Sequence, residues 1–334
     1  MKAAVFDGKN IIIKKVQEPQ MNDSQVLIKV KAAGICGTDL AIVKGYLPTP
    51  TPLILGHEFA GEVVEIGKNV KANWLGKHVT SEINSGIDNT CFYCKKGLFS
   101  QCISRKALGI DIDGAFAEYI AIESYMLHHI SSISYHEATF IEPLAAAFQV
   151  FEMMPLDSED KVMTIFGTGK LGLLLVQVAK TMGFKLFVID GSDKKLKLAK
   201  KFGASHTINR FEIKDIPKTI QNLTNGLGSD IVVDTSGNPD ALKDIVSSCR
   251  TRGKLHIKST HGLPTPIDLT DIVVRELTLY SSRCGPFEKA IKGLKSGNIK
   301  VNELISKVYP LDKIQEAFDS YEKSHDHIKT IIEI

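Results

Sequence analysis

One stretch in the middle of the chain decides the fold, Lys161-Val-Met-Thr-Ile-Phe166-Gly167-Thr168-Gly169-Lys170-Leu171-Gly172. Its first six residues are mostly apolar and predict a buried strand. Apolar residues then recur at helical spacing before Gly183, at Leu171, Leu174, Leu175, Val178 and Met182. The segment Lys185–Asp190 predicts a second strand, and this strand ends in an acid.

The order of strand, G-x-G-x-x-G, helix, strand and acid is typical of a unit that binds a dinucleotide. The first glycine permits a tight turn, the second lets the backbone approach the pyrophosphate, and the third lets helix and strand pack closely. The free N–H groups at the helix N-terminus would then face the phosphates. We therefore predict cofactor contacts along the whole loop, at Gly167, Thr168, Gly169, Lys170, Leu171 and Gly172.

Asp190 and the lysines after it bear on which dinucleotide we expect. The Asp190 carboxylate can accept hydrogen bonds from the adenosine ribose hydroxyls, which favours NAD, and it would repel a 2′-phosphate. Lys194 and Lys195 follow closely and leave NADP open, although they also suit the solvated start of a helix. We include Lys195 among the cofactor-binding candidates.

Further strands and helices alternate after this unit. Residues 231–237, 253–258 and 277–282 predict strands, and residues 240–249 predict a helix. This alternation predicts a doubly wound parallel sheet. Before residue 140 the pattern differs, because short β-rich segments are broken by Gly and Pro, which predicts an all-β, barrel-like part.

Metal-binding side chains stand on two short segments near the N-terminus, Gly34-Ile35-Cys36-Gly37-Thr38-Asp39 and Gly56-His57-Glu58-Phe59-Ala60-Gly61. Zn²⁺ prefers Cys and His side chains, and a carboxylate can supply a further ligand. Cys36 and His57 are the first two candidates, and Glu58 is either a third ligand or a neighbour of the metal. The alternative is a buried thiol with a surface His–Glu pair.

Three of the six cysteines cluster at Cys91, Cys94 and Cys102. The C-x2-C pair can hold one ion through two thiolates, and Cys102 can complete the group from a loop. In a reducing compartment such a cluster is more typical of metal binding than of disulfides.

Composition argues against several classes of partner. The 334 residues include 41 basic and 38 acidic side chains, and the net charge of +3 predicts neither a nucleic-acid nor an anionic membrane partner. Asp7 interrupts the N-terminus too early for a signal-peptide core, and no apolar run approaches the roughly 18 residues of a membrane span. We expect a cytoplasmic protein whose length allows two domains.

The segments Cys36-Gly-Thr-Asp39 and Gly56-His57-Glu58-Phe-Ala-Gly61 resemble the zinc-dependent medium-chain alcohol and polyol dehydrogenase family. The resemblance covers nearly the whole chain. It implies an α/β fold with a GroES-like catalytic domain at residues 1–140 and 285–334, and a Rossmann domain at residues 141–284. It also implies hydride transfer between NAD(P) and a secondary alcohol, polyol or sugar, with zinc polarising the substrate oxygen.

Individual roles follow from the same resemblance. Thr38 would accept the alcohol proton, and Glu58 would act beside the catalytic zinc. Glu142 opens Glu142-Pro-Leu, as in the polyol, threonine and sugar dehydrogenase branches, and would be a fourth zinc neighbour. It also suits the N-terminus of a helix. Ala41 stands where many members have a proton-relay histidine, so the onward path of the proton is left open.

The family also has a lobe that binds a structural zinc through four cysteines. This chain keeps the last three, at Cys91, Cys94 and Cys102, and has Asp88 at the first position. A carboxylate oxygen can ligate zinc, so we predict a structural site of three thiolates and Asp88.

Two other interpretations are a zinc-free reductase on the same fold and a non-catalytic cofactor-binding protein. Cys36, His57 and Glu142 argue against the first, and Ala41 alone favours the second. The strand at residues 277–282 lies at a sheet edge in this family, from which we expect a homodimer or homotetramer. The sequence leaves the substrate undetermined. Arg283 could bind an anionic group or serve the structure, and we expect His256 and His261 to be ordinary core or loop residues.

Overall fold

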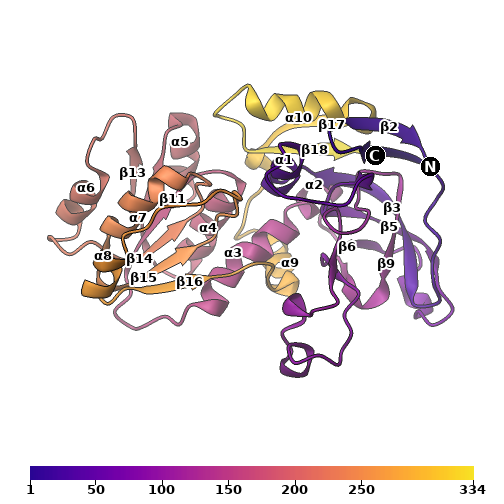
Figure 1. Cartoon of the computed structure of the whole chain (residues 1–334), viewed down its shortest axis with the longest axis horizontal. Helices are drawn as coiled ribbons and strands as arrows, with labels where there is room; N and C mark the ends of the chain where they lie inside the picture. Colours follow the sequence, from indigo (N-terminus) through magenta and orange to yellow (C-terminus); the bar gives the residue numbers. More distant parts are fainter.

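The computed structural model describes residues 1–334, apart from the side chain of Glu322. Two parts lie side by side, one built on a parallel sheet and one rich in antiparallel strands (Figure 1). This arrangement confirms the predicted α/β fold.

The first part is a six-stranded parallel sheet in the order β13-β12-β11-β14-β15-β16. Alternate residues of a strand face opposite sides, as Leu186 and Val188 join one core while Phe187 and Ile189 join another. Helices therefore cover both faces. The elements are β11 (Val162–Phe166), β12 (Lys185–Asp190), β13 (His206–Asn209), β14 (Ser229–Asp234), β15 (Cys249–Ile257), β16 (Thr278–Ser281), α3 (Ile141–Met153), α4 (Lys170–Thr181), α5 (Asp193–Lys201), α6 (Ile216–Leu223), α7 (Leu242–Ser248) and α8 (Leu269–Val274).

The helix after the glycine loop, α4, differs from the predicted amphipathic stripe. Leu173 and Val176 are buried as well as the predicted Leu174, Leu175 and Val178, because α3 packs on the side of α4 that faces away from the sheet. Met182 lies beyond the helix end and is 45% exposed, so its assignment to the apolar face was wrong.

The second part contains a seven-stranded sheet, with a path β10-β6-β5-β3-β18-β17 and β9 paired to β3, and a three-stranded sheet β2-β1-β4. Apolar side chains from both sheets form one core between them, which agrees with the predicted all-β part. The elements are β1 (Lys2–Phe6), β2 (Ile11–Lys15), β3 (Gln25–Gly34), β4 (Leu53–Ile54), β5 (Glu58–Ile66), β6 (His78–Ser81), β7 (Asn84–Ser85), β8 (Lys106–Ala107), β9 (Tyr119–Glu123), β10 (Leu127–His129), α1 (Gly37–Val43) and α2 (Tyr135–Ala138).

The C-terminal segment returns to this second part. It comprises α9 (Phe287–Lys295), β17 (Ile305–Pro310), α10 (Ile314–Glu322) and β18 (Lys329–Glu333). One half of β3 pairs with β9 and its end pairs with β18, which brings Ile331 opposite Gly34. Helix α9 packs on α3 instead, so the domain boundary expected after residue 284 stays a prediction.

Candidate active site

The first site segment is a short loop that ends β3 and starts α1. The backbone N–H of Cys36 donates to Asp39 Oδ2 at 2.7 Å, a contact that satisfies a donor just ahead of the first helical turn. Cys36 Sγ and Thr38 Oγ1 lie 3.8 Å apart. The loop therefore presents the thiol and the hydroxyl on the same side.

The second site segment enters β5 through Gly56, whose φ of +96° suits glycine. A Cβ here would also approach the Phe116 ring to 3.0 Å, and Ala115 donates its N–H to the Gly56 carbonyl at 2.8 Å. The segment around Phe116 thus packs against the loop that carries His57.

Ligand atoms of Cys36, His57 and Glu58 all lie within 4.8 Å of one another. One thiol, one imidazole and one carboxylate at this spacing fit a zinc ion in an open catalytic site. The predicted fourth member, Glu142, does not join this group. Its part as a ligand therefore stays a prediction.

The buried Asp39 carboxylate lies beside His57. His57 Nδ1 and Asp39 Oδ1 are 3.6 Å apart, and neither has a hydrogen-bond partner in the described residues. Burial disfavours the charge on His57, but Asp39 and Cys36 outweigh it and raise its pKa to about 10. A metal would have to displace this proton to bind the ring, and Nε2 is the nitrogen that faces away from Asp39.

Two lysines from distant elements hold the carboxylate of Glu58. Lys170 Nζ contacts Oε1, and Lys329 Nζ contacts Oε2, with Glu58 and Lys329 fully buried. Burial opposes the charge on Glu58, but the two ammonium groups outweigh it and lower its pKa. The contact of Lys170 places the predicted dinucleotide loop directly against the metal-binding group.

Three further polar side chains lie near Glu142. Lys258, at the end of β15, donates to the Ser282 carbonyl at 2.8 Å. Burial lowers the pKa of Lys258 to about 8, although the charges of Glu142 and Cys284 oppose this. Asn84 donates to Cys284 Sγ at 3.4 Å. The pKa of Glu142 is itself raised, first by loss of solvent and then by the charge of Glu58.

The glycines of the cofactor loop behave as the motif requires. A Cβ on Gly167 would meet Ser236 at 2.6 Å, and one on Gly172 would meet the Gly167 carbonyl at 2.0 Å, whereas Gly169 faces open space. The buried Thr168 Oγ1 has no hydrogen-bond partner in the described part of the chain. This loop, which starts α4 at Lys170, fits a bound phosphate group.

Asp190 binds the same loop. Its Oδ2 accepts the N–H of Thr168 at 2.7 Å, and its Oδ1 accepts the N–H of Ser192 at 2.9 Å. Lys195 is partly buried close to Asp190 and Asp326, and burial lowers its pKa against both charges. Lys194 is exposed, as its place at the solvated start of α5 predicts.

A second metal-type group lies on the segment that extends from the antiparallel part (Figure 1). Ligand atoms of Asp88, Cys91, Cys94 and Cys102 lie within 4.8 Å of one another, so the structure brings the four predicted residues together. The Asp88 carboxylate accepts N–H groups from Cys91 at 2.8 Å and Thr90 at 2.7 Å, which hold its pKa below the usual range.

Arg283 and two histidines have partners within the protein. Arg283 donates to the carbonyl of Ser100, so it attaches the cysteine segment to the end of β16. His256 is fully buried, with Nε2 2.9 Å from Ser282 Oγ, and His261 lies in a loop where its Nδ1 accepts the N–H of Leu263.

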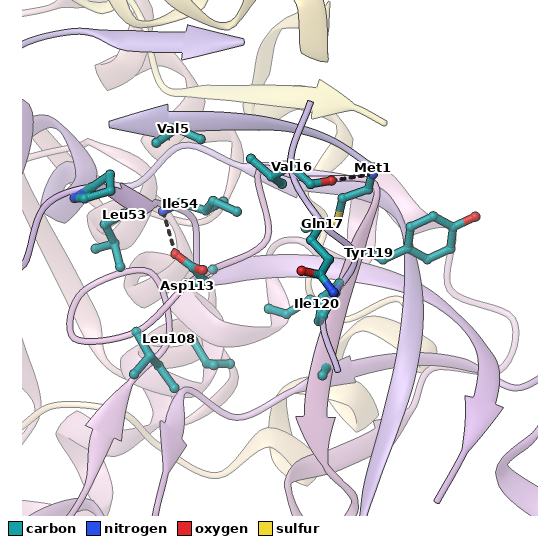
Figure 2. Close-up of a pocket in the computed structure, with 15 residues that line it drawn as sticks. Met1, Val5, Val16, Gln17, Leu53, Ile54, Leu108, Asp113, Tyr119 and Ile120 are labelled. Atoms are coloured by element: carbon teal, nitrogen blue, oxygen red, sulfur yellow. Dashed lines mark hydrogen bonds between the residues drawn. The ribbon is translucent and has the colours of Figure 1, made fainter. Parts of the chain in front are cut away.

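Features outside the site add little. A groove of about 550 Å³ lies on the antiparallel part, where Asp113 accepts the N–H of Ile54 at 2.9 Å (Figure 2). None of its lining residues belongs to either metal group. In the described residues, no helix is both long and apolar enough to cross a membrane.

Sequence reasoning missed the side chains that surround the metal-binding group, namely Asp39, Lys258 and Lys329, and the partner of Lys170. A lysine inside the apolar segment Ile328-Lys329-Thr-Ile-Ile332 was an available signal, because a charge at a buried strand position needs a partner.

Two family models match the chain, one for the alcohol dehydrogenase GroES-like domain at residues 22–132 and one for zinc-binding dehydrogenases at residues 171–296. The D-arabitol-phosphate dehydrogenase of Enterococcus avium is 35% identical over 325 residues, covering 94% of this chain and 91% of that protein. The sorbitol dehydrogenase of Halalkalibacterium halodurans is 31% identical over 327 residues, covering 96% and 94%.

A solved structure supports the same relation. A zinc-binding dehydrogenase from Sinorhizobium meliloti, bound to NADP, matches with a TM-score of 0.91 and 27% identity. The match covers 100% of this chain and 99% of that one.

We expect Asp88→Ala to weaken zinc retention in the cysteine segment, because one of four ligands is lost. Two zinc ions per chain should fall to about one when the protein is dialysed against a chelator and measured by atomic emission. Asp88→Cys, which completes four thiolates, should retain both ions. Unchanged retention by Asp88→Ala would remove Asp88 from the ligand set.

Proposed function

Because the chain belongs to the zinc-binding medium-chain dehydrogenase family, we propose that it oxidises an alcohol reversibly with a nicotinamide dinucleotide. The observation that carries this proposal is the contact between Lys170 of the dinucleotide loop and Glu58 of the metal-binding group. It unites the two halves of the reaction in one site. In this proposal, the GroES-like catalytic domain comprises residues 1–140 and 285–334, and the Rossmann domain comprises residues 141–284.

Cys36 and His57 would hold a catalytic zinc, with Glu58 and Glu142 as carboxylate neighbours. The ion would supply Lewis acidity at the substrate oxygen, and the nicotinamide would accept hydride. Asp39 orients His57 for this task. A structural zinc ion, which takes no part in the reaction, would be held by Asp88, Cys91, Cys94 and Cys102.

Thr38 would accept the alcohol proton at Oγ1. Its hydroxyl lies 3.8 Å from Cys36 Sγ, next to the expected metal position. The buried Ala41 supplies no onward acceptor, so the proton would pass from Thr38 to water or to a ribose hydroxyl.

The cofactor we propose is NAD. Asp190 ends β12 beside the loop that would receive the pyrophosphate, and Asp326 adds a second carboxylate nearby, where Ser192 Oγ donates to it at 2.6 Å. Two acids at this end would repel a 2′-phosphate, and the single partly buried Lys195 already lies between them.

For the substrate we propose a polyol, sugar or secondary alcohol. The relatives named above act on a polyol or a polyol phosphate, and Glu142 gives this site a carboxylate where the simple-alcohol branch has a cysteine. The other two candidates, a zinc-free reductase and a non-catalytic binding protein, lack a use for the group of Cys36 and His57.

We also propose a cytoplasmic homodimer or homotetramer that pairs through β16. This strand ends the parallel sheet, and apolar side chains stand exposed on it and on α8, with Leu279 43%, Val273 72% and Val274 74% exposed. An edge strand beside exposed apolar surface favours pairing with a second copy.

The test of this function is NADH formation by zinc-loaded protein with a panel of polyols, sugars and secondary alcohols. We expect turnover with one class, and its loss when a chelator removes the metal.

Thr38→Val should lower kcat by about 10²-fold or more with zinc still bound, because the proton acceptor is gone. Thr38→Ser, which keeps a hydroxyl, should retain most activity.

Turnover that survives complete metal removal would favour the zinc-free reductase. If no substrate of the panel gives NADH, with zinc and dinucleotide both bound, the result would favour the non-catalytic protein.

Asp190→Ser should shift cofactor use toward NADP. The change removes a charge that repels a 2′-phosphate and an acceptor for the ribose hydroxyls. We expect the ratio of kcat/KM for NADP over NAD to rise by about tenfold or more, in steady-state assays. A ratio that stays constant would show that Asp190 does not discriminate. Asp23→Ser, at an exposed position just before β3, serves as the control for general loss of charge.

Leu279→Lys should dissociate the assembly, because a charge would be buried at the paired edge. Light scattering after size exclusion should report a smaller species for this variant than for the unmodified protein. An equivalent change at Leu227, which is 69% exposed on another surface, should leave the mass unchanged.

A further inference from the structure

Glu58 contacts two lysine ammonium groups whose side chains differ in how far they can move. Lys329 and Lys170 each contact one carboxylate oxygen, so a single negative charge faces two positive ones in a buried site. Each carboxylate oxygen therefore has its own cation, and an anion that reached one of the ammonium groups would compete with Glu58 for it.

Lys329 is the fixed partner. Its side chain crosses Gly34, where an added Cβ would lie 2.0 Å from Lys329 Nζ, and the ammonium stands 5.3 Å from the centre of the Phe140 ring. The residue is fully buried in β18.

Lys170 is the partner that can move. It is the first residue of α4, next to Gly169, around which space is open. Its side chain is 12% exposed, in contrast to that of Lys329.

The loop that carries Lys170 is also the place where a dinucleotide's phosphates would arrive. The N-terminus of α4 offers free N–H groups, and the buried hydroxyl of Thr168 lacks a partner there in the described residues. A phosphate at this position would compete with Glu58 for the same ammonium.

We propose that Lys170 is a positioning residue shared between Glu58 and the cofactor phosphates, so that cofactor binding frees Glu58 to approach the metal. The inference rests on the proposed function, since it requires both zinc and a dinucleotide. Because the two binding events are linked, the factor by which bound phosphates change the affinity for the metal equals the factor by which the metal changes the affinity for phosphates.

The experiment measures zinc release from the holoenzyme into excess chelator. Zinc release from the unmodified protein is compared with release from a Cys36→Ser variant. The phase that is missing in the variant belongs to the catalytic ion. Saturating ADP, which carries the pyrophosphate without the nicotinamide, should slow this phase by about tenfold. Adenosine, which has no phosphate, should leave the rate unchanged.

Variants then assign the effect to Lys170. In Lys170→Met the release should already be slow without ADP, because Glu58 keeps one ammonium partner only, and ADP should change it by less than about twofold. Lys170→Arg retains a cation and should keep the response. Lys180→Met, at the far end of the same helix, makes the same change in charge and should respond as the unmodified protein does.

A cycle with Glu58→Gln tests the pathway. Once Glu58 is neutral, adding Lys170→Met should produce no further change in the release rate, since the two residues act through one contact.

Three results would overturn the inference. The first is an ADP response in Lys170→Met equal to that of the unmodified protein, and the second is an adenosine response equal to that of ADP. The third is a shift in Tm that shows ADP binding, together with an unchanged rate of zinc release. If ADP fails to bind at all, the proposed function loses its cofactor as well, so the two failures are distinguishable.

Discussion

Burial of the Glu58 carboxylate is the constraint on which the arrangement of the two parts depends. An isolated charge in a dry interior is unfavourable by several kcal/mol, so its partners must come to it. They come from β18, a strand of the seven-stranded sheet, and from the first turn of α4, a helix that packs on the parallel sheet. The orientation of the parallel sheet against the antiparallel part is thereby tied to one side chain next to the expected metal position.

Features encoded locally could be predicted from the sequence. The glycine loop, its flanking strands and Asp190 lie within thirty consecutive residues, and each glycine meets the steric limit that its position in the motif implies. The metal-binding group of Cys36, His57 and Glu58 was recognisable for a similar reason, because donors of the right chemistry stand on two short loops.

Contacts between distant segments were out of reach. Lys329 meets Glu58 across 271 positions and Lys170 meets it across 112, and no local pattern encodes such pairings. Strand β13 was also missed, since His206-Thr-Ile-Asn209 has one fully apolar residue and gains its place only by pairing with β12. The part of Glu142 as a zinc neighbour came from a family motif, and it stays a prediction because its carboxylate is not among the atoms that cluster around Cys36 and His57.

The contact between Arg283 and the carbonyl of Ser100 gives the cysteine segment a second role. The arginine lies two residues after the end of β16, and the carbonyl belongs to the segment that carries the four metal-type side chains. Loss of order in one therefore loosens the other. Hydrogen exchange at the edge of the parallel sheet would accelerate together with that of the cysteine segment, and the two would open as one cooperative unit.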